Sequence, residues 1–181
     1  MVGRNFELGI KGELAAGRAN WSAALFQLDQ TNLGMIDPAT PFDEGNACEG
    51  WCYLAAGKVR TRGVDLGVQG ELTSRWTLAA NYSWFNSAHA AGEDDGQRYV
   101  PYMPRHNLRF ATLYRPGDGR WTVGGTLRAQ NGVYTDATNY RARQGSLVVV
   151  GLSTGYALTP ATSLTALIDN VFDRRYYMEL S

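Results

Sequence analysis

The sequence predicts an all-β fold of antiparallel strands that span a bacterial outer membrane. The first observation is an alternation of apolar and polar residues along the chain: Phe6, Leu8 and Ile10, for example, alternate with Glu7 and Lys11. Side chains on a strand point to opposite faces in turn, so each segment has one apolar and one polar face. The second observation is that short turns alternate with long polar segments. A transmembrane barrel requires both features, because lipid surrounds it and water fills it.

About eight strands are expected, within the even-numbered range that bacterial barrels use. In chain order they lie near Asn5–Ala15, Asn20–Asn32, Lys58–Leu72, Trp76–Ala88, Arg105–Arg115, Trp121–Tyr134, Gly145–Leu158 and Thr162–Phe172. Short connections at 16–18, 73–75, 116–119 and 159–161 carry the Gly, Pro, Asp and Ser residues of hairpin turns. Long polar loops are expected at Leu33–Gly57, His89–Pro104 and Thr135–Gln144. The whole chain, residues 1–181, forms one domain in this prediction.

Aromatic residues recur near the expected strand ends. Trp21, Trp76 and Trp121 follow short turns, and Trp84 and Tyr134 lie toward the long loops. Amphipathic rings prefer the headgroup level of a bilayer, so two aromatic girdles would follow. The alternative is a soluble β-sandwich or lipocalin-like barrel, because alternation does not reveal whether the apolar face meets lipid or a core.

Composition excludes some classes of function. Lys+Arg and Asp+Glu both number 17, so the basic imbalance of a nucleic-acid-binding surface is missing. No apolar run is long enough to span a bilayer as a helix, but barrel strands need only about ten residues each. The first residues lack the basic, apolar and small-residue regions of a signal peptide. We therefore expect the chain to be a piece of a longer protein.

Two cysteines, Cys48 and Cys52, flank Glu49-Gly50-Trp51 in the first long loop. A close pair at a cell surface or in a periplasm is expected to form a disulfide. Half of a metal site is the alternative, and no second Cys or His pair completes one. The two histidines, His89 and His106, show neither ligand spacing nor a nucleophile elbow. We expect no catalytic residue, no metal site and no cofactor-binding site.

Four motifs in order carry a family resemblance. They are Gly3-Arg4-Asn5-Phe6-Glu7-Leu8-Gly9-Ile10-Lys11-Gly12-Glu13, Lys58-Val59-Arg60-Thr61-Arg62-Gly63-Val64-Asp65-Leu66, Val100-Pro101-Tyr102-Met103-Pro104-Arg105-His106 and Leu167-Ile168-Asp169-Asn170-Val171-Phe172-Asp173-Arg174-Arg175-Tyr176-Tyr177. Together they make the chain similar to the C-terminal part of the β-barrel of TonB-dependent siderophore receptors. The resemblance implies about eight strands of a plugged barrel of roughly 22. The plug, the coupling box, the earlier strands and the final strand are then expected to lie outside this chain.

The resemblance also implies a function. Such a receptor imports ferric siderophores through the outer membrane of a Gram-negative bacterium and is energised by the TonB complex through the plug. Its partners would be outer-membrane lipid, the ferric siderophore and TonB, and it is not an enzyme. Aromatic loop residues would contact the ligand, and five lie in or beside the expected outer loops: Trp51, Tyr53, Tyr99, Tyr102 and Tyr140.

Two other functions fit the strand pattern less well. A self-contained eight-stranded outer-membrane barrel with a structural or adhesive role would need a signal peptide and a final aromatic strand. An outer-membrane hydrolase built on a barrel would need a nucleophile beside a histidine at lipid level, whereas His89 and His106 lie at loop edges.

Overall fold

The computed structural model describes residues 1–37, 39–40, 42–45, 47–91, 94–137 and 140–177, and these contain strands but no α-helix. Accordingly, none of the described segments is a helix able to cross a membrane. The strands in chain order are β1 (Val2–Leu14), β2 (Ala19–Ile36), β3 (Tyr53–Thr73), β4 (Trp76–His89), β5 (His106–Tyr114), β6 (Trp121–Gln130), β7 (Val133–Ala137), β8 (Tyr140–Gln144), β9 (Leu147–Thr159) and β10 (Thr162–Ile168). The all-β antiparallel fold predicted from the alternation is confirmed.

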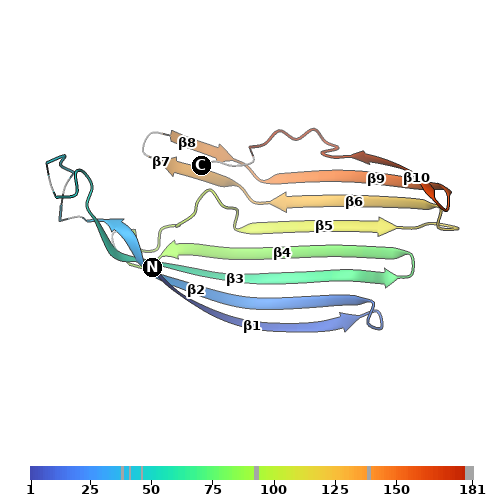
Figure 1. Ribbon diagram of the computed structural model, residues 1–181, viewed down its shortest axis with the longest axis horizontal. Helices are drawn as coiled ribbons and strands as arrows, with labels where there is room; N and C mark the ends of the chain where they lie inside the picture. The colour runs from blue at the N-terminus through green and yellow to red at the C-terminus, as the bar shows by residue number, and fades with distance from the viewer. Residues whose placement is uncertain (38, 41, 46, 92–93, 138–139, 178–181) are drawn as a thin grey trace. The chain divides into compact units, whose positions relative to one another are not determined.

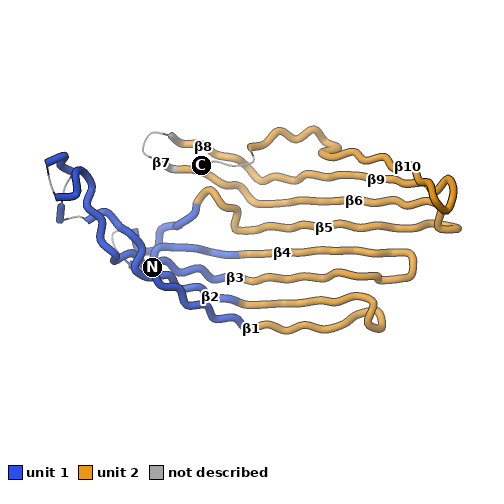
Figure 2. Tube along the Cα trace, viewed as in Figure 1, with its two compact units in different colours: residues 1–7, 26–63, 85–100 blue, residues 8–25, 64–84, 101–181 orange. Residues whose placement is uncertain are grey.

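The described chain divides into two compact units, to both of which the long strands β1 to β4 contribute residues (Figure 2). The larger unit comprises residues 8–25, 64–84 and 101–181. Its main sheet has the order β1-β2-β3-β4-β5-β6-β9-β10, in which each strand pairs with its neighbour (Figure 1). Most neighbours in the sheet are therefore also neighbours in the chain, as in a meander whose hairpins follow one another.

The register of this sheet is unbroken between β4 and β5 and between β6 and β9. Trp76 of β4 is opposite Tyr114 of β5 in the first of nine residue pairs, and Trp84 is opposite His106 in the last. Pairing of β6 with β9 begins with Trp121 opposite Tyr156. The two rings of that last pair contact each other, with centroids 4.7 Å apart. Aromatic side chains thus gather where the turns are short, as a girdle at the headgroup level requires.

The smaller unit comprises residues 1–7, 26–63 and 85–100. It contains the ends of β1 to β4 that adjoin the connection between β2 and β3 and the segment after β4. Isolated bridges link Asp43 with Gly50 and Ala88 with Arg98. Each bridge closes part of a segment that the sequence predicts as a long polar loop, so both loops carry local strand-like pairing.

The sequence prediction was wrong about the segment between β6 and β9. One strand was expected over Trp121–Tyr134 and a loop over Thr135–Gln144, whereas β6 ends at Gln130 and β7 and β8 form a separate hairpin. Asn131 explains the break, because its side chain donates to the Gly132 carbonyl (2.9 Å) and accepts from the His106 backbone N–H (2.7 Å). These side-chain bonds compete with the strand ladder and end it.

Candidate functional site on the polar sheet face and the loop segments

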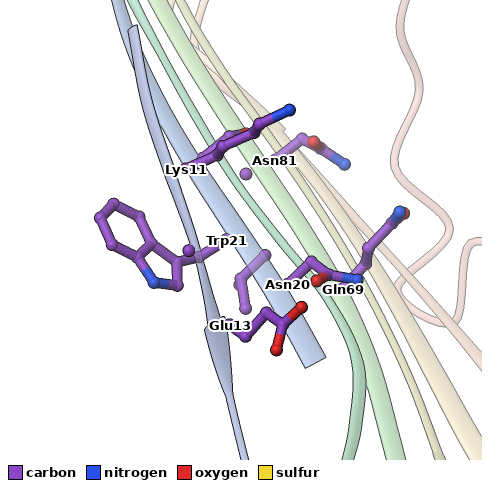
Figure 3. A pocket seen from close by; sticks show the side chains of 10 residues that line it. Lys11, Glu13, Asn20, Trp21, Gln69 and Asn81 are labelled. Atoms are coloured by element: carbon purple, nitrogen blue, oxygen red, sulfur yellow. The ribbon is translucent and has the colours of Figure 1, made fainter. Parts of the chain in front are cut away.

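A polar hollow of about 660 Å³ lies on one face of the larger unit (Figure 3). Its polar side chains come from the first four strands: Lys11, Glu13, Asn20, Ser22, Gln69 and Asn81. Figure 3 shows these side chains on one side of the strands, while the ring of Trp21 projects from the other side. The alternation that the sequence predicts therefore produces a real division into a polar and an apolar face.

A glycine at the centre of the polar face brings its neighbours together. A Cβ atom on Gly67 would lie 3.1 Å from the Asn81 Oδ1 atom and 3.2 Å from the Ser22 Oγ atom. The missing side chain on β3 thus leaves room for polar side chains from β2 and β4. This arrangement offers amide, hydroxyl, ammonium and carboxylate groups to water or to a polar partner. It presents hydrogen-bonding groups, as expected of the interior of a transmembrane barrel.

The opposite face of the same unit is apolar and exposed. Trp21 lies over Gly12, where a Cβ atom would approach the indole Nε1 atom to 2.7 Å. Large apolar side chains stand out from neighbouring strands, including Leu8 (74% exposed), Leu25 (55%) and Leu66 (44%). An exposed apolar band of this kind marks a surface that another apolar phase covers. Lipid is the covering phase for an outer-membrane barrel.

A disulfide joins Cys48 and Cys52 in the loop between β2 and β3, with Cα atoms 5.3 Å apart. Within the same loop the rings of Phe42 and Trp51 contact each other, with centroids 5.3 Å apart. Gly50 adopts a φ of +140°, and a Cβ atom there would meet the Phe42 ring at 3.4 Å. The positive φ lets the chain turn between the cysteines at low steric cost. Nothing in the cysteine spacing alone indicates the contact with Phe42.

The five aromatic candidates from the sequence do not form one cluster among the described residues. Trp51 lies within the segment closed by the disulfide and Tyr53 directly after it, and they are 48% and 68% exposed. Tyr99 packs edge-on against His89, with centroids 5.2 Å apart. In the larger unit Tyr102 is also exposed. The side chain of Tyr140 lies outside the described part of the structure, so its placement stays a prediction.

Both histidines contact aromatic side chains. His89 packs against Tyr99, and the His106 Nδ1 atom lies 2.8 Å from the Tyr82 hydroxyl. Within the described ranges no group of three His, Cys, Asp or Glu side chains is arranged to hold a metal ion. Near His89 in the sequence, Asp94 and Asp95 lie in a turn, where the Asp94 carbonyl accepts a hydrogen bond from the Gln97 backbone N–H at 2.8 Å.

A hydrogen-bonded network in the smaller unit joins side chains of β2 and β3. Arg60 on β3 forms an ion pair with Asp29 on β2 through its Nε atom, and the Gln27 amide donates to the same carboxylate at 2.7 Å. Gln27 in turn accepts a hydrogen bond from the Arg62 Nε atom at 2.8 Å. The spacing of the two arginines shows that they share a strand face, but not that Asp29 and Gln27 lie opposite them.

The segment after β10 is organised by Asn170. Its side chain accepts a hydrogen bond from the Arg174 backbone N–H (2.9 Å) and donates one to the Arg174 carbonyl (3.0 Å). Asn170 has a positive φ of 52°, which Asn tolerates better than most residues. Beyond this turn the Tyr176 ring lies 5.3 Å from the Arg128 guanidinium, a cation–π contact with β6. Residues Asn170 to Arg174, in the last of the four sequence motifs, therefore form a tight turn.

Comparison with known proteins gives a consistent result. A family model described as TonB dependent receptor-like, beta-barrel matches residues 1–171. The chain is similar to two receptors of Pseudomonas putida. The ferric-pyoverdine 358 receptor is 31% identical, and the match covers 97% of this chain and 21% of the receptor. The ferric-pyoverdine BN7/BN8 receptor is 33% identical, and the match covers 99% of this chain and 20% of the receptor. The solved structure of the pyoverdine receptor FpvA from Pseudomonas aeruginosa PAO1 has a TM-score of 0.85 at 29% identity, covering 97% of this chain and 26% of its own. The chain spans about a fifth of the two Pseudomonas putida receptors.

Proposed function

The chain belongs to the TonB-dependent receptor-like β-barrel family, and on this premise we propose that it is part of the wall of an outer-membrane receptor that imports ferric siderophores. The similar receptors of Pseudomonas putida are named for ferric pyoverdine, and the chain aligns with them along almost its whole length. We place the chain in the C-terminal part of such a barrel, as its motifs indicate. The remaining strands and the plug would then be supplied by other parts of the receptor.

The single observation that carries this proposal is the two-faced sheet. One face carries exposed leucines and tryptophan, and the other carries the polar hollow lined by Lys11, Glu13 and Asn81. A soluble β-protein would bury its apolar face, whereas a barrel wall must leave it for lipid. The polar face supplies the hydrogen-bonding groups that a hydrated interior or an inserted plug requires.

The loops would supply the contacts with the ligand. Trp51 and Tyr53 are exposed and held near a disulfide, so their rings are positioned at low entropic cost. Tyr99, Tyr102 and Tyr140, which the sequence places in or beside the other long loops, are further candidates for contact with the ligand. The TonB complex would act on the plug and would not contact these residues. We assign the chain no catalytic role, since its relatives are receptors.

A self-contained eight-stranded barrel is not favoured. Within the larger unit, β1 and β10 stand at the two ends of the strand order, so the described sheet is open. A closed barrel would pair its first and last strands. An open sheet fits a segment of a wider wall, whose neighbouring strands complete the pairing on both sides.

The test begins with the DNA on both sides of the coding sequence, which should encode a plug upstream and an aromatic-ended strand downstream. The complete gene is then expressed in a Gram-negative host lacking its own siderophore receptors, and accumulation of radioactive iron from ferric pyoverdine is measured. We expect uptake that disappears in a host without functional TonB. Start and stop codons flanking these 181 residues, with no uptake, would overturn the proposal.

Ligand contact by the loop is tested in the same receptor with two tryptophan variants. Trp51→Ala should weaken binding of ferric pyoverdine, because Trp51 is exposed beside the disulfide. Trp121→Ala is the matched control, since Trp121 lies at the short-turn end of β6. Both are compared at equal surface density. Equal affinity of the two variants would remove Trp51 from the ligand site.

A further inference from the structure

Two arginines lie opposite each other on the polar face of the larger unit. Arg109 of β5 is opposite Arg128 of β6, and on its other side Arg109 is opposite Asn81 of β4. Residues directly opposite in an antiparallel pair share one face of the sheet. Since Asn81 lines the polar hollow, both arginines belong to the face that carries it. Two positive charges are therefore neighbours on that face.

The strands around this arginine pair contain no acidic residue. Neither Asp nor Glu occurs in β4, β5, β6, β9 or β10, which follow one another in the sheet (Figure 1). Asp169 follows β10, where a Cβ atom on Gly151 of β9 would lie 3.1 Å from its Oδ1 atom, so β9 lies between this carboxylate and Arg128. In the part of the chain that the structure describes, neither arginine of the pair forms an ion pair. This part of the sheet therefore leaves their charges unbalanced.

The surroundings of Arg128 increase the need for an anion. Its Nε atom is buried and has no hydrogen-bond partner among the described residues. The Tyr176 ring covers one side of the group, with its centroid 5.3 Å from the guanidinium carbon. A buried charged donor without an acceptor costs more free energy than a neutral one. Arg105, directly before β5, likewise has a buried Nε atom for which the described residues supply no acceptor.

A carboxylate has the chemistry that this pair requires. Arginine does not lose its proton in proteins, so a change of protonation cannot relieve the repulsion between two like charges on facing strands. The planar fork of each guanidinium group matches the two oxygens of a carboxylate. One carboxylate between the two groups would replace a repulsion by two attractions and supply acceptors for the buried donors.

The position of the pair indicates which part of the receptor supplies the carboxylate. Arg109 lies in the middle part of β5, between His106 and Tyr114 at its ends. The two arginines belong to the wall whether or not a ligand is bound, so the balancing charge must be a permanent part of the interior. We propose that Arg109 and Arg128 together bind a carboxylate of the plug, an inference that rests on the proposed function above. The pair would hold the plug against β5 and β6.

The experiment uses the complete receptor in lipid vesicles, with a fluorophore on one cysteine introduced into the plug to report its unfolding in urea. Arg109→Gln/Arg128→Gln should raise the unfolding constant of the plug about 30-fold or more, because a carboxylate is left inside without its partners. Each Asp and Glu of the plug is then replaced in turn by its amide, Asn or Gln. One of these replacements should weaken the plug of the unmodified receptor and not weaken that of the double variant any further.

Arg120→Gln is the matched control, because Arg120 is exposed in the turn between β5 and β6, where it pairs with Asp118. Its plug should unfold within about twofold of the unmodified receptor, since exposed ion pairs contribute little. An equal effect of Arg120→Gln and the double variant would overturn the proposal, as would the absence of any plug carboxylate that couples to the arginines. If the double variant fails to fold, Arg109→Gln alone keeps the test decisive, with about a tenfold rise expected.

Two further outcomes would assign the anion elsewhere and overturn the proposal. Plug unfolding that depends on the concentration of phosphate, without coupling to a plug carboxylate, would indicate an inorganic anion. Loss of affinity for ferric pyoverdine in the double variant, with unchanged plug unfolding, would assign the carboxylate to the ligand. Uptake of ferric pyoverdine by the unmodified receptor is measured separately. A receptor that takes up iron but shows no coupling between the arginines and the plug would overturn this inference alone and leave the proposed function intact.

Discussion

Gly70 is the position where one added methyl group should most disturb the sheet. It has a φ of +137°, and a Cβ atom there would lie 2.3 Å from the Arg18 carbonyl oxygen and 2.4 Å from the Ala19 Cα atom. The Arg18 carbonyl is also the acceptor for the Glu71 backbone N–H at 2.9 Å. Ala19 is fully buried. The added atom would therefore meet backbone that cannot turn aside and would displace a ladder hydrogen bond.

The expected cost of Gly70→Ala follows from two effects. A positive φ outside the usual regions costs a residue with a side chain about 1–3 kcal/mol. Overpacking against immovable neighbours costs about 1–3 kcal/mol more. The free energy of unfolding should thus fall by about 2–6 kcal/mol. Gly145→Ala is the matched control, because a Cβ atom there has no neighbour within 4 Å and no positive φ opposes it.

The assay is urea unfolding of the receptor that carries this chain, reconstituted in lipid vesicles and followed by tryptophan fluorescence. We expect a lower midpoint for Gly70→Ala, while Gly145→Ala stays within about 1 kcal/mol of the unmodified protein or is slightly stabilised. Coincident unfolding curves for Gly70→Ala and the unmodified receptor would refute the reasoning. They would mean that β2 and β3 tolerate separation at this point.

Three further predictions concern the same receptor. Thr61→Val should cost about 1–3 kcal/mol in urea unfolding, because it leaves the buried Ser87 hydroxyl without its partner, and adding Ser87→Ala should recover most of that loss; a double variant as unstable as the single one would contradict this account. Gly12→Ala should cost about 1–2 kcal/mol and shift tryptophan emission, since its Cβ atom displaces the Trp21 ring; unchanged emission would argue against the ring contact. Cys48→Ser should expose one thiol to a maleimide reagent, speed proteolysis of the loop and lower the free energy of unfolding by about 2 kcal/mol, the loop entropy of a closed segment of about five residues; thiol labelling of the unmodified receptor would show that the pair is reduced.

The sequence predicts the strands of this chain well because a sheet between lipid and water imposes alternation on every residue of a strand. Trp76 and Trp121 begin strands in the structure as they do in the prediction. Their positions follow from turn chemistry and from the headgroup preference of the indole ring. These determinants act over a few residues, so a single sequence displays them.

The parts that escaped prediction depend on contacts between distant residues. The break after Gln130 rests on the Asn131 side chain bonding both to the next residue and to the start of β5. The Arg60–Asp29 pair depends on the register of β2 against β3, which two isolated strand patterns do not determine. The Phe42–Trp51 contact likewise depends on how the loop returns toward β3.

Burial gives the physical reason for regarding this chain as part of a larger assembly. Among the described residues only four apolar side chains are buried: Ala19, Val59, Val133 and Leu147. Burying a large apolar side chain contributes about 1.5–3 kcal/mol. A core of these four residues therefore does not offset the conformational entropy that is lost when strands of this length become ordered. The edge strand β10 is exposed along its whole length. On the side away from β9, this strand must be stabilised by a further neighbouring strand, and its exposed residues such as Leu164 by contact with lipid. Both are present only in a completed barrel wall.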